Sequence, residues 1–185
     1  MSGPLETERE LVGKVIAGSR TAFGELVGPH SNRLLTLAAR MLGSRSMAED
    51  ALQNALASVW LARHRLDAAR PIGPYLTTTL LNKCRDLLRR RKAARLFGIQ
   101  YSGDDLVMID ESPDAETIAV DRQELSLLQS EIERLPIKLR EALVLVTIDG
   151  RSQSEAAELM GVSEKAIETR IYRARKQLRE KIDNF

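Results

Sequence analysis

Apolar residues near the end of the chain recur at the spacing of two short helices. In SQSEAAELMGVSEKAIETRIYRARKQL, a first apolar group runs from Ala156 to Leu159. A second group falls every three or four residues: Ile167, Ile171, Ala174 and Leu178. This spacing places each group on one helical face, which predicts two amphipathic helices rather than strands.

The residues around these groups predict where each helix begins and ends. Ser152 and Glu155 have the spacing of a capping box, so the first helix should begin there. Gly161 tolerates the left-handed backbone of a helix end, and Ser163 is a suitable cap for the second helix. The sequence therefore predicts a helix-turn-helix with a turn of about three residues.

The second helix should expose a polar and largely basic face. Its outward residues are Lys165, Glu168, Thr169, Tyr172, Arg173 and Lys176. Such a helix is about 10 to 12 Å wide and fits the major groove of duplex DNA. A solvated, charged surface helix is the alternative, but the capped helix, the glycine turn and the basic second helix together favour DNA binding.

Helical periodicity also covers the first half of the chain. We expect helices at about residues 6–17, 21–27, 31–42, 47–65 and 73–92. Ser46 and Glu49 predict a capping box for the fourth helix. The acidic groups in its first turns suit the helix dipole, and from the residues alone this role is favoured over binding. Trp60 is interpreted as core, with an interface anchor as the alternative.

Charge is segregated along the chain although the net charge is only +2. Residues 70–95 carry eight basic and one acidic side chains, and residues 96–135 carry two basic and ten acidic ones. The arginines near residue 90 have almost no acidic neighbours in the sequence, so we expect them to need an external polyanion such as phosphate. A solvated helix end is the alternative.

The acidic stretch has the composition of a linker. Residues 98–121 lack periodicity and include Gly103 and Pro113. We therefore predict a domain at 1–95, a linker at 96–121 and a second domain at 122–185. The negative charge of the linker is interpreted as favouring solubility; occupation of a basic channel on a partner is the alternative.

Composition argues against several other classes of protein. No run approaches the ~20 apolar residues of a membrane span, and the N-terminus lacks an apolar signal core, so we expect a cytoplasmic protein without membrane insertion. The single cysteine, Cys84, excludes an internal disulfide and a cysteine-rich zinc site. His30 and His64 are isolated, and no glycine-rich phosphate loop is present. No catalytic residue, metal or cofactor is predicted.

Three segments carry a family resemblance. They are AFGELVGPHSNRLLTLAARMLGSRSMAEDALQNALASVW, YLTTTLLNKCRDLLRRR and LPIKLREALVLVTIDGRSQSEAAELMGVSEKAIETRIYRARKQL. In this order they resemble bacterial RNA polymerase sigma factors of the extracytoplasmic-function (ECF) group, over nearly the whole chain. The resemblance implies an all-α fold with a region 2 helical bundle and a region 4 helix-turn-helix, joined by a flexible acidic linker. It implies a specificity subunit that directs core RNA polymerase to promoters of a stress or envelope response and is not an enzyme.

The resemblance also implies roles for particular residues. Those in the segment that docks the clamp helices of the largest polymerase subunit are Asp50, Gln53, Asn54 and Trp60, which raises a contact role above the helix-dipole interpretation. Those implied for minus-10 recognition and melting are Arg70, Asn82, Lys83, Asp86, Arg89 and Arg90. Those implied for the minus-35 major groove are Ser163, Glu164, Lys165, Glu168, Thr169, Arg170 and Arg173. The implied partners are core polymerase, including the flap of its second large subunit, promoter DNA and an anti-sigma factor.

Four residues depart from the family pattern. Tyr75 stands where tryptophan is common, Leu81 where arginine often precedes the asparagine, and Asn54 where glutamate is usual. Glu168 replaces a frequent lysine in the recognition helix. Because a carboxylate accepts from cytosine N4 and is repelled by phosphate, Glu168 should change promoter preference.

A stand-alone transcriptional regulator with a helix-turn-helix output domain is the alternative function. It would share the C-terminal evidence and bind duplex DNA without polymerase. The basic block at residues 83–95 and the lack of alternating strands and helices argue against it.

Overall fold

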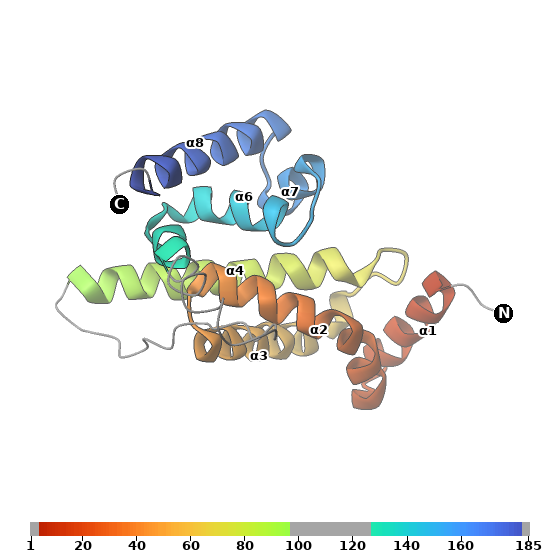
Figure 1. Cartoon of the computed structure of the whole chain (residues 1–185). Helices are drawn as coiled ribbons and strands as arrows, with labels where there is room; N and C mark the ends of the chain where they lie inside the picture. Colours follow the sequence, from red (N-terminus) through yellow and green to blue (C-terminus); the bar gives the residue numbers. More distant parts are fainter. Residues whose placement is uncertain (1–3, 97–126, 183–185) are drawn as a thin grey trace, which may run out of the picture.

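The computed structural model describes residues 4–96 and 127–182, and every regular element in those ranges is a helix (Figure 1). The all-α prediction is therefore confirmed. Apart from Leu96, the predicted acidic linker at 96–121 lies outside the described residues.

The N-terminal domain is a bundle in which three long helices pack side by side (Figure 1). Its elements are α1 (Pro4–Ile16), α2 (Arg20–Leu42), α3 (Arg45–Leu61), a 3-10 turn η1 (Arg63–Arg65) and α4 (Ile72–Leu96). Leucines and small residues fill the space between these helices, among them the fully buried Leu37, Ala51 and Leu80. The bundle gives α4 a rigid support for the polar residues along it.

The prediction of two separate helices at 21–27 and 31–42 is wrong. The structure has a single helix there, α2, which continues without a break through Pro29. Proline inside a helix costs about 3 kcal/mol because it lacks an N–H and crowds the preceding turn. Leu26 and Leu34, on either side, are both buried in the core, and their burial offsets this cost. Tertiary packing thus overrides the local helix-breaking signal.

The start of α3 also differs from the prediction. The cap is Ser44, whose hydroxyl accepts from the backbone N–H of Met47 at 3.3 Å. The capping box predicted at Ser46 and Glu49 is therefore wrong. Glu49 instead pairs with Arg45 one turn earlier, at 3.0 Å. Ser44 is buried and precedes the helix directly, whereas Ser46 already lies within it.

The C-terminal domain contains the predicted helix-turn-helix. Residues 127–134 are helical, and α6 (Ile137–Thr147), α7 (Gln153–Met160) and α8 (Glu164–Ile182) follow. The helix α8 packs against both α6 and α7. Its predicted inward residues Ile167, Ile171, Ala174 and Leu178 are all buried. The predicted helical face and the turn are confirmed.

The two domains lie against each other. In Figure 1, α6 lies between α8 and the N-terminal bundle; α6 contacts α2, and α7 contacts α4. Buried apolar residues of α6 and α7, including Val144 and Ala156, belong to the same cluster as Leu37 and Leu81 of the bundle. The described parts of the chain therefore form one packed body.

Cys84 lies inside this body, on α4, and its side chain is fully buried. Burial raises the pKa of the thiol to about 12, and the nearby Glu141 carboxylate raises it further than Arg85 lowers it. Its interpretation as a packing residue agrees with this position.

The folded protein should therefore react very slowly with thiol reagents. At pH 8, a pKa of about 12 in place of an ordinary value near 9.0 lowers the thiolate fraction about 1000-fold, and burial slows access as well. We expect reaction with a chromogenic disulfide to be at least about 1000-fold slower in native buffer than in guanidinium chloride. Equal rates in the two solutions would contradict the buried position of Cys84.

Candidate nucleic-acid interface

The turn of the helix-turn-helix is fixed by local hydrogen bonds. The backbone N–H of Glu155 donates to the Ser152 hydroxyl at 3.1 Å, and the backbone N–H of Ser152 donates to the Glu155 carboxylate at 2.9 Å. The Ser152 N–H and the Arg151 guanidinium hold the pKa of Glu155 below its usual value, which keeps this carboxylate ionised. Gly161 then ends α7 at a φ of 63°. The predicted capping box and glycine turn are confirmed.

The first turns of α8 present the predicted minus-35 residues. The Ser163 hydroxyl accepts from the backbone N–H of Ala166 at 3.3 Å, so this serine caps the helix. Glu164 and Arg173 are exposed. Lys165 and Glu168 are exposed and pair with each other at 2.7 Å. The lysine therefore partly neutralises the carboxylate that the sequence places on this face.

Two further predicted residues are partly buried at the edge of α8. The Thr169 hydroxyl donates to the carbonyl oxygen of Lys165 at 2.8 Å, so its methyl group and the hydroxyl oxygen as an acceptor are left for an external contact. The Arg170 guanidinium lies 4.0 Å from the Met160 sulfur of α7. All seven residues predicted for minus-35 recognition thus lie within the first three turns of α8 or at its cap.

A residue from a distant helix supports the start of α4. The backbone N–H of Ile72 donates to the Glu8 carboxylate of α1 at 2.6 Å. This bond satisfies one of the donors that a helix start leaves unpaired. It also ties the loop before α4, which carries Arg70, to the bundle. Arg70 is exposed and pairs with Asp67 of the same loop at 3.3 Å.

The structure brings several predicted minus-10 residues onto one stripe of α4. Asn82, Asp86 and Arg89 follow at helical spacing, and Asp86 pairs with Arg89. Lys83 is half-buried and Arg90 is exposed on adjacent sides of the helix. This stripe combines amide, carboxylate and guanidinium groups, which can hydrogen-bond bases and hold phosphates.

The prediction that the arginines of α4 need an external polyanion is corrected for two of them. Arg89 is paired with Asp86 as described above. Arg85 donates through Nε to Glu141 of α6 at 3.0 Å and through Nη1 to the Asn82 side chain at 2.7 Å. The carboxylate partner of Arg85 lies in the other domain, far away in the sequence, so neighbouring residues could not indicate it.

The predicted polymerase-binding residues lie on α3. Asp50, Gln53 and Asn54 are exposed on successive turns. Trp60 is half-buried at the far end of the helix, with its ring 5.4 Å from that of Phe23 and the Arg63 guanidinium 4.8 Å from its centre. These contacts hold the ring in a fixed orientation while leaving part of it accessible.

Leu61 is an exposed apolar residue that the sequence analysis did not predict as a candidate contact. The side chain of Leu61 is 72% exposed, and it lies on the same face of α3 as Asp50 and Asn54 because it follows them at helical spacing. Tyr172 on α8 is 64% exposed, in agreement with its predicted outward position. The sequence does not indicate whether a single leucine at a helix end is buried or exposed. Its exposure in the structure identifies Leu61 as a candidate contact.

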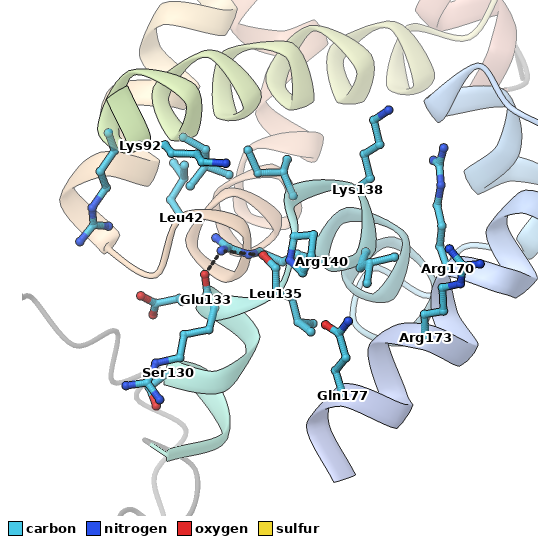
Figure 2. Close-up of a pocket in the computed structure, with 16 residues that line it drawn as sticks. Leu42, Lys92, Ser130, Glu133, Leu135, Lys138, Arg140, Arg170, Arg173 and Gln177 are labelled. Carbon is cyan, nitrogen blue, oxygen red and sulfur yellow. Dashed lines mark hydrogen bonds between the residues drawn. The ribbon is translucent and has the colours of Figure 1, made fainter. Parts of the chain in front are cut away.

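A groove of about 1290 Å³ separates α4 from α8 (Figure 2). Its basic residues come from α4, from residues 134–140 and from α8: Arg91, Lys92, Arg134, Lys138, Arg140, Arg170 and Arg173. In Figure 2, Lys92 lies on one side of the groove and Arg170 and Arg173 on the other. The basic parts of the two domains therefore face one space.

Comparisons with known proteins agree with this arrangement. Residues 26–94 match the family Sigma-70 region 2, and residues 125–178 match Sigma-70 region 4. The RNA polymerase sigma factor CnrH of Cupriavidus metallidurans is 36% identical, over 97% of this chain and 96% of CnrH. The chain is a sigma factor of the ECF group. Like other members, this sigma factor acts with core RNA polymerase in promoter-specific transcription initiation.

Two further comparisons place this sigma factor within its family. The ECF sigma factor SigM of Mycobacterium tuberculosis is 33% identical, over 93% of this chain and 83% of SigM. A solved structure of CnrH in complex with the cytosolic domain of CnrY is 34% identical, with a TM-score of 0.68, and the match covers 96% of this chain and 98% of that chain. Both comparisons extend across the two domains.

The structure gives no sign of a membrane span or a metal cluster within the parts of the chain that it describes. Across residues 4–96 and 127–182, no helix is both long and apolar enough to cross a bilayer. In the same ranges, no three histidine, cysteine or acidic side chains gather in a way that could hold a metal ion.

Proposed function

We propose that this sigma factor reads a two-part promoter, with α8 in the minus-35 major groove and α4 at the minus-10 element. The observation that carries this proposal is the solvent-facing polar side of α8, which begins at a capped helix start and continues through Arg173. Side chains at the start of such a helix reach base edges, while arginines further along reach phosphates.

The stripe of Asn82, Asp86 and Arg89 on α4 is suited to single-stranded minus-10 DNA. Opening the duplex and flipping a base costs a few kcal/mol, which base contacts and phosphate contacts must offset. The Asn82 amide can contact a base, and exposed Arg90 can hold the backbone. Arg70 lies in the loop before α4, where it can contact the same strand.

The exposed face of α3 is proposed as the docking surface for the clamp helices of core polymerase. Asp50, Gln53 and Asn54 supply polar contacts, and Leu61 adds an apolar contact at the end of the same face. Trp60, held by Phe23 and Arg63, forms the border of this surface. The region 4 domain would reach the flap of the second large subunit.

We also infer regulation by an inhibitory protein partner, an anti-sigma factor. Support comes from CnrH, which was solved with the cytosolic domain of CnrY bound. The sigma factor would act in the cytoplasm, as a specificity subunit rather than as a catalyst, on promoters of a stress or envelope response.

Transcription with purified core polymerase tests the proposed function directly. Sheared genomic DNA from the source organism is transcribed with and without the chain, and new transcript starts are sequenced. We expect new starts that share two motifs separated by about one and a half to two helical turns. If no new starts appear while the chain alone shifts duplex DNA, the stand-alone regulator is the correct function.

Changing Glu168 to lysine should alter minus-35 preference. The carboxylate can accept from cytosine N4, and its removal also frees Lys165 from their ion pair. Selection from a library randomised at the minus-35 element should therefore yield a different consensus for Glu168→Lys. Glu180→Lys is the matched control, because Glu180 also pairs with a lysine on α8, Lys176, at 3.8 Å but near the other end of the helix. An identical consensus for all three proteins would refute this role of Glu168.

Replacing Leu61 with serine should weaken binding to core polymerase. Removing one large apolar side chain from the interface is expected to raise Kd about tenfold. A labelled chain titrated with core enzyme provides the measurement, by fluorescence anisotropy. Ile16→Ser is the control, because Ile16 is also an exposed apolar residue but belongs to α1. The docking surface is misplaced if Leu61→Ser binds as tightly as the unchanged chain.

A further inference from the structure

Glu8 lies on the face of α1 that packs against the bundle. Val12 and Val15 of the same helix are 1% and 0% exposed, and Glu8 precedes them at helical spacing. Glu8 itself is half-buried, whereas Glu10, two residues further along α1, is exposed. A carboxylate on an inward face adds nothing to apolar packing, so its bond to Ile72 requires an explanation of its own.

The residues at the start of α4 supply no cap of their own. Pro71, which precedes the helix, has no side-chain oxygen, and the first turn holds no acidic residue. Because Pro71 and Pro74 lack a backbone N–H, the donors of this helix start belong to Ile72 and Gly73. The Glu8 carboxylate accepts from Ile72 at 2.6 Å, at the positive end of the helix dipole. The cap of α4 therefore comes from α1, 64 positions away in the sequence.

The packing around Ile72 makes this bond difficult to replace. Ile72 is only 4% exposed. The His30 ring of α2 covers the next residue, since a Cβ added to Gly73 would lie 3.4 Å from it. A residue so well covered leaves little room for a water molecule as substitute acceptor. Without Glu8, the Ile72 amide would be a buried donor without a partner, which is costly.

The bond holds one end of a short ordered loop. This loop, residues 66–71, is called the Arg70 loop below. Its apolar residues Leu66 and Ala68 pack against the core of the bundle. The backbone N–H of Arg70 donates to the carbonyl oxygen of Asp67 at 3.1 Å, and the two side chains form the ion pair described above. The loop is therefore folded on itself and attached to the bundle before any DNA is present.

The position of Arg70 depends on the position of Ile72. Only Pro71 separates the two residues. A proline fixes its own φ and restricts the residue before it to an extended backbone, so the chain from Arg70 to Ile72 has little freedom. Holding the Ile72 amide thus also holds Arg70 relative to α4. If the bond were absent, ordering the loop on DNA would cost conformational entropy.

We propose that Glu8 is a positioning residue for minus-10 recognition, which holds the Arg70 loop in the conformation that receives the unpaired DNA strand. The proposal rests on the proposed function of this loop and of the polar stripe on α4. Flipping a base costs free energy that contacts must offset, and a loop already in place leaves more of the contact energy for opening the duplex. The helix α1 thus influences promoter opening without contacting DNA.

Three variants of the full chain test this role. Glu8→Ala removes the acceptor of the Ile72 amide, whereas Glu8→Gln removes the charge and keeps a side-chain oxygen that can accept the same bond. Glu10→Ala is the matched control, because it removes the same charge from the same helix at an exposed position. Circular dichroism verifies that each variant is folded. Binding to core polymerase should be unchanged in all three, since the proposed docking surface lies on α3.

Hydrogen exchange of the Ile72 amide, followed by NMR, measures the bond without any assumption about function. We expect exchange to be about tenfold or more faster in Glu8→Ala than in the unchanged chain, and within about twofold of it in Glu10→Ala. Glu8→Gln should lie between Glu8→Ala and the unchanged chain. Equal exchange rates in Glu8→Ala and the unchanged chain would show that Glu8 does not hold the loop, and would overturn the proposal.

Transcription from promoter libraries then measures the effect on recognition. The libraries are built on a promoter found with the unchanged chain and are randomised at the minus-10 or the minus-35 element. We expect the ratio of transcription between preferred and disfavoured minus-10 sequences to fall about fivefold or more in Glu8→Ala. Glu8→Gln should restore part of this ratio. The minus-35 preference should be unchanged, because α8 belongs to the other domain.

The two preferences separate positioning from stability. If Glu8 only stabilised the fold, Glu8→Ala would lower transcription from every promoter alike and leave both preferences as they are, which would overturn the proposal. Failure of the sigma function would instead appear as missing transcript starts for the unchanged chain. Failure of the present proposal would leave those starts in place and the minus-10 preference of Glu8→Ala intact.

Discussion

Two carboxylates that are almost completely shielded from solvent, Glu141 and Asp149, constrain how the whole chain packs. Each needs a positive partner: Arg85 of the bundle pairs with Glu141, and Asp149 pairs both with Arg33 of the bundle and with Arg151 of its own domain. These ion pairs and the apolar cluster that the two domains share place α6 against α2 and α4. Because α7 and α8 pack on α6, the orientation of the recognition helix follows from the same contacts.

The contact between the two domains combines ion pairs with apolar packing. Buried residues of α6 and α7 join the apolar cluster of the bundle, so closing removes apolar surface from water. A second cluster, centred on Ile132, Leu143 and Ala174, lies within the C-terminal domain alone. That internal cluster packs the helix-turn-helix against residues 127–147 independently of the bundle.

The parts that the sequence predicts well are those fixed by neighbouring residues. The capping box at Ser152 and the turn at Gly161 depend on bonds within a few positions, and both were predicted correctly. Pro29 misled the prediction because buried neighbours keep α2 continuous across it. The Arg85–Glu141 pair spans 56 positions in sequence, so no local pattern could reveal it. The candidate site residues were predicted from the resemblance and stay predictions, whereas Leu61 became a candidate only because the structure shows it exposed.

The pairing of Arg85 changes how the basic block of α4 should be understood. An arginine without an acidic neighbour in the sequence does not necessarily require an external phosphate, because a carboxylate from another domain can form the ion pair instead.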